Sequence, residues 1–170
     1  ANSSVTRMIK GNNRITSALE VNSQKTMDIA SSLDLATLRL SLYEVKKRQN
    51  LTQLSDTNTV YVISHDFDLK RKTWNIPKNC ILVFRGGKIV NGTLTGQVLN
   101  RELELKNFLS DTDDMTEAIT NCFTILPAGG MVKLPRRELT IDESIIISKG
   151  CLLQGDSTKI CIKDRKSTRL

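Results

Sequence analysis

A passage that occurs twice constrains the fold of this chain more than any other feature. The first copy, residues 74–90, reads WNIPKNCILVFRGGKIV, and the second, residues 145–161, reads IIISKGCLLQGDSTKIC. Matching residues lie 71 positions apart, so that Cys80 corresponds to Cys151 and Leu82 to Leu153. Short β segments that repeat are typical of stacked architectures, because a single unit cannot bury its own apolar face. The repeat therefore predicts stacked β units that build a long rigid surface.

Short β-strands are predicted after position 58, where helical periodicity gives way to alternation of apolar and polar residues. Turn signals such as Gly86-Gly87 and Asn91-Gly92 separate these strands. Strands this short, with turns this frequent, do not fit a doubly wound sheet. The predicted strands cover residues 59–63, 73–76, 80–84, 88–90, 93–95, 131–134, 139–141, 144–147, 151–153 and 159–162.

Residues 14–54 contain no Pro or Gly and predict an α-helical stem. Within it, a seam at heptad spacing is formed by Leu35, Leu38, Leu42 and Val45. Residues 38–42 also alternate as a half-buried strand would, but Leu is a good helix former and is not β-branched, so we favour the helix. Further apolar side chains widen this surface beyond the seam. We therefore expect the stem to associate, as a trimer or against another protein.

A second helix is predicted over 111–126, with Asp111 or Thr112 as its N-cap. Its apolar stripe contains Met115, Ile119 and Phe123, together with Cys122 and Leu126. The stop signal is the sequence Pro-Ala-Gly-Gly that follows. We expect Met115, Ile119 and Phe123 to cover the open end of the second β unit, because natural proteins cover exposed strand edges.

The net charge of +7 invites a nucleic-acid interpretation, but the distribution of the basic residues argues against it. Apart from clusters at 46–48 and 163–169, they are scattered, and no aromatic residues interleave with them for stacking on single strands. No apolar run approaches the length of a membrane span, and no segment has the order of a signal peptide. We therefore expect neither a nucleic-acid partner nor a membrane partner.

The four cysteines, at positions 80, 122, 151 and 161, form no CxxC pair. Zinc-ligand spacing is absent, and Cys80 and Cys151 hold equivalent places in the repeat. Free cysteine behaves as a small buried hydrophobe, so buried thiols are favoured over a disulfide or a metal site.

Three pairs of carboxylates are candidates for chemistry. Asp66 and Asp68 alternate beside His65, the only histidine, and Glu102 and Glu104 repeat the pattern. Paired carboxylates hydrolyse glycosides when held at the right separation, whereas the competing interpretation is a solvent-facing strand with Phe67 turned inward. Asp142-Glu143 has a loop-like context. Motifs of nucleophilic, phosphate-binding and metalloprotease sites are missing, so we assign no catalytic residue, cofactor or metal.

Two stretches carry a resemblance to known proteins. Residues 111–162 read DTDDMTEAITNCFTIL, PAGG, MVKLP, ELTIDESIIIS and KGCLLQGDSTKICI, and resemble the opening of pectate-lyase-like right-handed parallel β-helices. Residues 61–96 (YVISHDFDLKRKTWNIPKNCILVFRGGKIVNGTLTG) are similar to the module that precedes such β-helices in tail fibres and tailspikes of crAss-like phages of Bacteroides-type hosts. Arg136-Arg137 and Asp156-Ser157 depart from the small turn residues that are usual in that pattern.

The resemblance implies a virion protein of the phage tail, assembled in the host cytoplasm. It implies a homotrimer whose N-terminal segment attaches to other tail or baseplate proteins, and a host surface polysaccharide bound by residues beyond 170. The alternatives are the N-terminal part of a β-helical polysaccharide lyase or glycoside hydrolase, and a cytoplasmic helical adaptor with a small β domain. A stack that stops at Leu170 has an open end, so we expect the natural polypeptide to continue.

The predicted fold is mainly β with an N-terminal α-helical stem. Residues 1–55 are expected to be the stem, which trimerises or docks. Residues 56–106 are expected to be a first short-stranded β module, and residues 107–170 a capping helix with the first rungs of a parallel β-helix.

Overall fold

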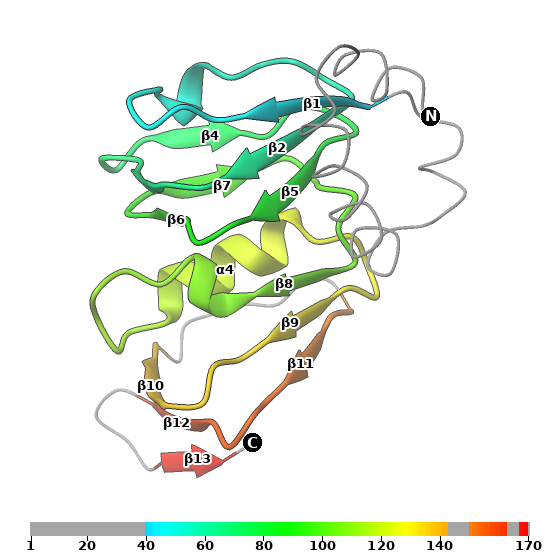
Figure 1. The fold of residues 1–170 in the computed structure, drawn as a ribbon. Helices are drawn as coiled ribbons and strands as arrows, with labels where there is room; N and C mark the ends of the chain where they lie inside the picture. Colours follow the sequence, from blue (N-terminus) through cyan, green and yellow to red (C-terminus); the bar gives the residue numbers. More distant parts are fainter. Residues whose placement is uncertain (1–39, 143–149, 163–166, 170) are drawn as a thin grey trace.

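A computed structural model describes residues 40–142, 150–162 and 167–169 of the chain (Figure 1). This part is mainly β, and its helical elements are α4 (Thr116–Ile125) and the short 3-10 turns η1 (Leu51–Gln53) and η2 (Leu105–Asn107). The strands are β1 (Ser41–Glu44), β2 (Thr59–Ile63), β3 (Asp66–Asp68), β4 (Thr73–Asn75), β5 (Ile81–Phe84), β6 (Lys88–Val90), β7 (Thr93–Thr95), β8 (Glu102–Glu104), β9 (Met131–Lys133), β10 (Glu138–Ile141), β11 (Leu152–Gln154), β12 (Lys159–Ile162) and β13 (Ser167–Arg169).

Parallel pairing between successive stretches of chain organises the first β unit, residues 59–95. Strands β2, β3 and β4 pair in parallel with β5, β6 and β7, respectively. The register partners, at nearly equal spacing in the three pairs, are Val60 with Ile81, Asp66 with Lys88, and Thr73 with Thr93. Each stretch of chain therefore lies directly on the one before it, in three separate short sheets.

The second β unit, residues 131–162, has the same plan. Strand β9 pairs in parallel with β11, and β10 pairs in parallel with β12. The spacing of the partners matches that of the first unit, since Met131 faces Leu152 and Glu138 faces Lys159. Strand β8 adds to the other edge of β9 in parallel, and β13 adds to β12 in antiparallel. In Figure 1 this unit lies below the first, with α4 between them.

The sequence repeat corresponds to equivalent strands of the two units. Strands β5 and β6 lie in the first copy, and β11 and β12 occupy the same positions in the second. The predicted strands over 59–63, 88–90, 93–95 and 159–162 are confirmed with those bounds, and most of the others to within one residue. The strand predicted over 144–147 lies outside the described residues.

The helical stem predicted over 14–54 is wrong for its described part. Leu42 lies in strand β1, and Val45 directly follows β1 and is fully buried. Strand β1 pairs in parallel with β2, which supplies main-chain hydrogen bonds and sets the ring of Tyr43 edge-on against Tyr61 at 6.1 Å. This tertiary pairing overrides the helix propensity of leucine. Leu35 and Leu38, the other seam residues, lie outside the described residues.

Helix α4 begins later than predicted, and neither Asp111 nor Thr112 is its N-cap. The N-cap position is held by Met115. The N–H of Thr140 in β10 donates to the carbonyl of Asp113 at 2.7 Å, and the N–H of Met115 donates to the carbonyl of Thr140 at 2.8 Å. Because these bonds hold the preceding residues beside β10, the helix begins only at Thr116.

One continuous apolar cluster fills the interior of both β units. It contains Trp74 and Leu82 from the first unit, and Val132 and Leu139 from the second. The three predicted helix residues, Met115, Ile119 and Phe123, belong to it with at most 7% of each exposed. The cluster therefore runs across the boundary predicted near residue 106.

Two glycines mark where neighbouring stretches of chain approach most closely. A Cβ atom at Gly87 would overlap the carbonyl oxygen of His65, and one at Gly92 would overlap the side chain of Leu69. Only glycine fits at such a close approach of two chain segments. The Gly-Gly and Asn-Gly turn signals thus serve the stacking as well as the turns.

Candidate functional site

A shallow groove of about 430 Å³, lined by polar and charged residues, runs between β7 and the first turns of α4. Helix α4 lies against β7 and η2, so the groove forms where the helix succeeds the strand in the stack. The groove is lined by Arg71, Thr93, Ser110, Thr112, Asp114, Thr116, Glu117, Thr120 and Asn121.

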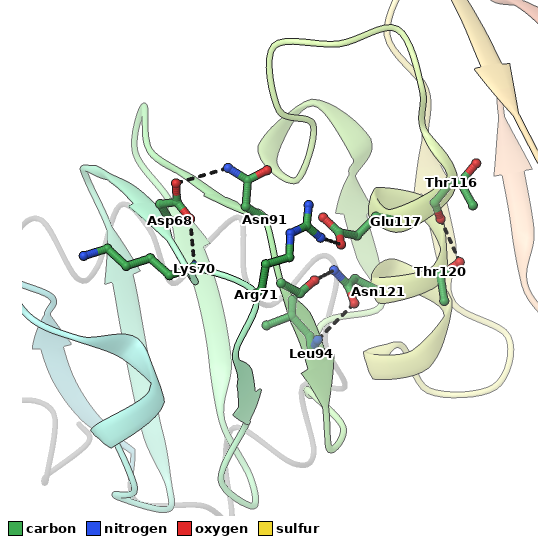
Figure 2. A network of polar contacts seen from close by, with 10 residues as sticks. Asp68, Lys70, Arg71, Asn91, Leu94, Thr116, Glu117, Thr120 and Asn121 are labelled. Atoms are coloured by element: carbon green, nitrogen blue, oxygen red, sulfur yellow. Dashed lines mark hydrogen bonds and ion pairs between the residues drawn. The ribbon is translucent and has the colours of Figure 1, made fainter.

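An exposed ion pair crosses the groove. The Arg71 guanidinium Nη1 lies 2.6 Å from the Glu117 carboxylate Oε2, and both side chains remain more than 40% exposed (Figure 2). Arg71 follows Lys70, and both have left-handed backbone conformations at φ 66° and φ 51°. An ion pair at this exposure stabilises a fold by less than about 1 kcal/mol. Its main effect is to orient the Arg71 turn toward the helix.

Asn121 is the one buried polar side chain of the groove, and it continues the hydrogen bonding of β7. Its Oδ1 accepts the N–H of Leu94 at 2.9 Å, and its Nδ2 donates to the carbonyl of Gly92 at 3.0 Å (Figure 2). The side-chain amide thus has the same two bonding groups as a strand peptide and uses both. The main-chain groups of β7 need these side-chain hydrogen bonds, because α4, which follows β7 in the stack, offers no strand edge to pair with.

Asn100 repeats this arrangement at β5. Its Oδ1 accepts the N–H of Leu82 at 3.0 Å, its Nδ2 donates to the carbonyl of Leu82 at 2.9 Å, and its residue is only 1% exposed. Neither asparagine lies in a recognisable sequence motif. The available signal was a polar residue on an apolar stripe, since Asn121 lies between the buried Ala118 and Cys122.

The carboxylates Asp66 and Asp68 lie where the strand interpretation placed them, on the exposed side of β3, with Phe67 buried. Asp68 accepts the N–H of Lys70 at 2.7 Å and the side-chain amide of Asn91 at 3.1 Å. These two hydrogen bonds, to Lys70 first and then to Asn91, lower the pKa of Asp68 below its usual value. A carboxylate with a lowered pKa is a poor general acid at neutral pH.

The other carboxylate candidates are held in surface contacts. Glu102 lies 3.2 Å from the Lys133 ammonium, and Glu104 lies 3.7 Å from Lys106, on the outward side of β8. The Asp142 N–H donates to the Thr116 hydroxyl at 2.9 Å. Glu143 lies outside the described residues.

The thiols and the phenol of the interior stay protonated. Burial raises the pKa of Cys122 and, with a smaller effect from Asp56, that of Cys80. Burial, followed by the effects of Cys80 and Asp56, raises the pKa of Tyr61 to about 12. The predicted burial is confirmed for Cys80 and Cys122, whereas Cys151 and Cys161 are only partly buried, and none of the four forms a disulfide. A protonated thiol is not a nucleophile, so Cys80 and Cys122 serve packing.

Neither a metal-binding cluster nor a membrane-spanning helix occurs in the described ranges. Histidine, cysteine and carboxylate side chains nowhere gather there in a group of three that could hold an ion. The helices within the same ranges are all too short and too polar to span a bilayer.

No match was found among known proteins. No protein-family model, no curated protein and no solved structure matches this chain. The groove itself offers hydrogen-bonding hydroxyls and carboxylates around the ion pair between Arg71 and Glu117, which is already formed.

Proposed function

We propose that this chain is the N-terminal part of a phage tail fibre or tailspike, in which a right-handed parallel β-helix presents a surface that binds host glycans. In this proposal the chain is a structural component of the virion. It connects other tail or baseplate proteins to a glycan-facing region beyond residue 170.

The observation that carries the proposal is the parallel pairing at a nearly constant step on three sides of the first β unit. A chain that pairs with itself in this way grows along one axis, by about 4.8 Å for each added stretch. The second unit keeps the same step, with Met131 opposite Leu152 and Glu138 opposite Lys159. Growth along one axis produces a rod, which is the shape that a spike needs.

The side chains of the first unit support the same interpretation. Strands β3 and β4 expose their first and last residues and bury the middle one, Phe67 and Trp74, respectively. The interior is apolar and continuous, so bending the rod would open packed contacts. Stacked β units of this kind transmit force along their axis without a moving part.

The trimer in this proposal no longer rests on Leu42 and Val45, since both belong to the β region. It rests on the similarity of residues 61–96 to the module that precedes β-helices in tail fibres and tailspikes, a resemblance that implies a homotrimer. Native mass spectrometry of the full chain tests it directly. A mass three times the 19.0 kDa of the chain is expected, and a monomer at micromolar concentration contradicts the trimer.

Attachment to the virion is tested with antibodies against the full chain. We expect immunogold labelling of the tail ends of phage particles from cells that carry this sequence. Particles that lack the protein after gradient purification contradict the proposal. We also expect no release of reducing ends or unsaturated products from host polysaccharide by this chain, and turnover lost in the double variant Asp66→Asn, Asp68→Asn would instead place an enzyme here.

A further inference from the structure

The corner of the chain that carries Arg71 is longer than the stack requires. The strand pairs β3–β6 and β4–β7 are in register on both sides of this corner, so the corners they enclose connect equivalent strand ends. Between β6 and β7 the chain turns with two residues, 91–92, whereas between β3 and β4 it uses four, 69–72. The longer corner is therefore not needed for the turn itself.

Two residues of the longer corner adopt a disfavoured backbone conformation. Lys70 and Arg71 lie in the left-handed region at φ 51° and φ 66°, which residues other than glycine rarely adopt. The Lys70 N–H donates to the Asp68 carboxylate at 2.7 Å, and the Arg71 N–H donates to the Asn91 carbonyl at 2.8 Å. Strained backbone that its surroundings hold in place is common at binding sites. Here it directs the Arg71 side chain toward Glu117 at the groove (Figure 2).

The ion pair between Arg71 and Glu117 leaves hydrogen-bonding groups unused on both partners. The guanidinium contacts the carboxylate through Nη1 and Oε2 alone, at 2.6 Å. A guanidinium carries five N–H donors and a carboxylate has two acceptor oxygens. Within the described part of the chain, the remaining donors of Arg71 and the Oε1 of Glu117 have no partner, and neither do the hydroxyls of Thr93 and Ser110 in the same groove. The groove therefore presents donors and acceptors side by side to solvent.

The charges of the groove indicate the class of ligand. Its described lining contains one cation, Arg71, and two carboxylates, Asp114 and Glu117. Because the cation is already paired, the lining has no excess positive charge for a phosphate or a carboxylate. A sugar hydroxyl both accepts and donates hydrogen bonds, so it can accept from the guanidinium while it donates to the neighbouring carboxylate. A neutral sugar therefore matches these groups without breaking the ion pair.

We propose that the groove between β7 and α4 binds a neutral sugar, with Arg71 and Glu117 as its main contacts and the hydroxyls of Thr93 and Ser110 as further contacts. Its volume of about 430 Å³ falls within the range of about 300–1,000 Å³ that is usual for small-molecule sites. None of the described residues that line the groove is aromatic, so no ring stacks on the sugar. We therefore expect weak binding, with a dissociation constant of about 1 mM.

This inference goes beyond the proposed function. It places a sugar site within the described residues, whereas the proposed function places the glycan contact beyond residue 170. It uses only the geometry and the charges of the groove, and its test does not depend on attachment to a virion.

The first test is an NMR titration of the full chain. ¹H–¹⁵N spectra are recorded with increasing glucose, galactose, mannose or N-acetylglucosamine, and separately with sodium phosphate as an anion and glycine as a zwitterion. We expect at least one of these sugars to shift the amide resonances of Arg71, Thr93 and Glu117 until the shifts saturate. Failure of all the sugars to do so, or saturable binding of phosphate or glycine alone, would overturn the proposal.

The second test measures the same titration in variants of Arg71. We expect Arg71→Ala to raise the dissociation constant of the sugar about tenfold, because it removes hydrogen bonds from a charged donor. Its matched control is Arg85→Ala, which removes an exposed arginine from the corner between β5 and β6, outside the groove. Equal dissociation constants in the two variants would overturn the proposal.

A third variant separates sugar binding from a structural role of the ion pair. Arg71→Lys keeps the positive charge opposite Glu117 but loses the planar fork of donors. We expect it to keep the far-UV circular dichroism and the melting temperature of the parent while it binds the sugar more weakly. An Arg71→Lys variant with the sugar affinity of the parent would show that the guanidinium does not contact the sugar, and would overturn the assignment.

Discussion

Asn121 and Asn100 each use a side-chain amide where a strand would place a peptide group. The amide offers one donor and one acceptor in fixed geometry, and both are used on the main chain of the neighbouring strand. A buried main-chain group left without a partner destabilises a fold by about 1–3 kcal/mol. The two residues therefore belong to the backbone hydrogen bonding of the stack.

We predict that Asn121→Ala lowers the free energy of unfolding by about 2–4 kcal/mol, because it leaves the N–H of Leu94 and the carbonyl of Gly92 without partners. The measurement is urea denaturation followed by circular dichroism. The control is Asn75→Ala on the exposed side of β4, whose amide accepts only the hydroxyl of Thr95. Equal losses in the two variants would show that the buried position of Asn121 is unimportant.

Asp68 makes the stability of the first unit depend on pH. Its two hydrogen bonds lower its pKa in the folded state, first from the Lys70 N–H and second from the Asn91 amide. A lowered folded pKa stabilises the fold above the unfolded pKa of about 3.9, and this contribution disappears as the pH falls through the folded pKa.

We predict that Asp68→Asn is less stable than the parent at neutral pH and that this difference vanishes in acid, below the folded pKa. Melting temperatures measured from pH 7 down to pH 2 check the prediction. Asp66→Asn, on the same exposed side of β3, is the matched control. It should still lose, in acid, the stability that Asp68 contributes at neutral pH. A gap between Asp68→Asn and the parent that stays constant across the range would contradict the assignment.

At the scale of elements, helix α4 replaces a strand in the stack. It lies against β7, and its N-terminal neighbours pair with Thr140 of β10. Its buried side, with Ile119 and Phe123, joins the interior cluster between the two units. The helix therefore closes the lower edge of β7 with side chains and not with a main-chain ladder.

We predict that Phe123→Asp lowers the free energy of unfolding by several kcal/mol, because an unpaired carboxylate would be placed among apolar side chains. Thermal denaturation checks this. The control is Thr120→Asp on the exposed side of the same helix, which should melt within a few degrees of the parent. A Phe123→Asp variant that melts with the control would show that α4 contributes no packing.

The elements that sequence could predict are those marked by local signals. Asn91 adopts the left-handed backbone at φ 59°, which is why an Asn-Gly pair punctuates the chain between β6 and β7. The end of helix α4 follows from Pro127, whereas its start at Thr116 is set by the pairing of the preceding residues with β10. Strand β1 shows the limit, because the sequence of residues 38–42 fits both periodicities and only the non-local pairing of β1 with β2 decides between them.

The buried asparagines could not be predicted, because their role depends on which strand lacks a neighbour in three dimensions. Asn100 acts on Leu82, 18 residues earlier, and Asn121 acts on Leu94, 27 residues earlier. Neither distance follows from a local pattern. The burial of Met115, Ile119 and Phe123 could be predicted, because a helix that is buried on one side has apolar residues at a regular spacing in its sequence.

At the scale of the whole molecule, one interior cluster links the two β units. Trp74 is fully buried in the first unit, where its fluorescence can be followed, and Leu139 is fully buried in β10 of the second unit. Stacked units that share a large interface unfold together, whereas weakly coupled units unfold in separate steps.

We predict that Trp74 fluorescence and far-UV circular dichroism report the same unfolding transition. Leu139→Ala in the second unit should lower the free energy of unfolding by about 2–5 kcal/mol. It should shift the unfolding midpoints of both signals equally, although Trp74 lies in the first unit. The control is Leu152→Ala, which removes a side chain that is 62% exposed. A Leu139→Ala variant that shifts only the circular dichroism would indicate two independent units.

Where Asn121 and Asn100 bond the edges of β7 and β5, side-chain amides take the place of a neighbouring strand, and this affects where the chain can change in length. Main-chain ladders demand a fixed step along the chain, and the strand pairs within the two units keep that step nearly constant. Between β8 and β9 the step is longer, since Glu102 pairs with Met131, and α4 occupies the extra length. Because the amide of Asn121, within this junction, bonds β7 in place of a main-chain ladder, residues added or lost in the loops on either side of α4 break no strand pairing. The junction can thus change in length while the strand pairs on either side of it keep their register.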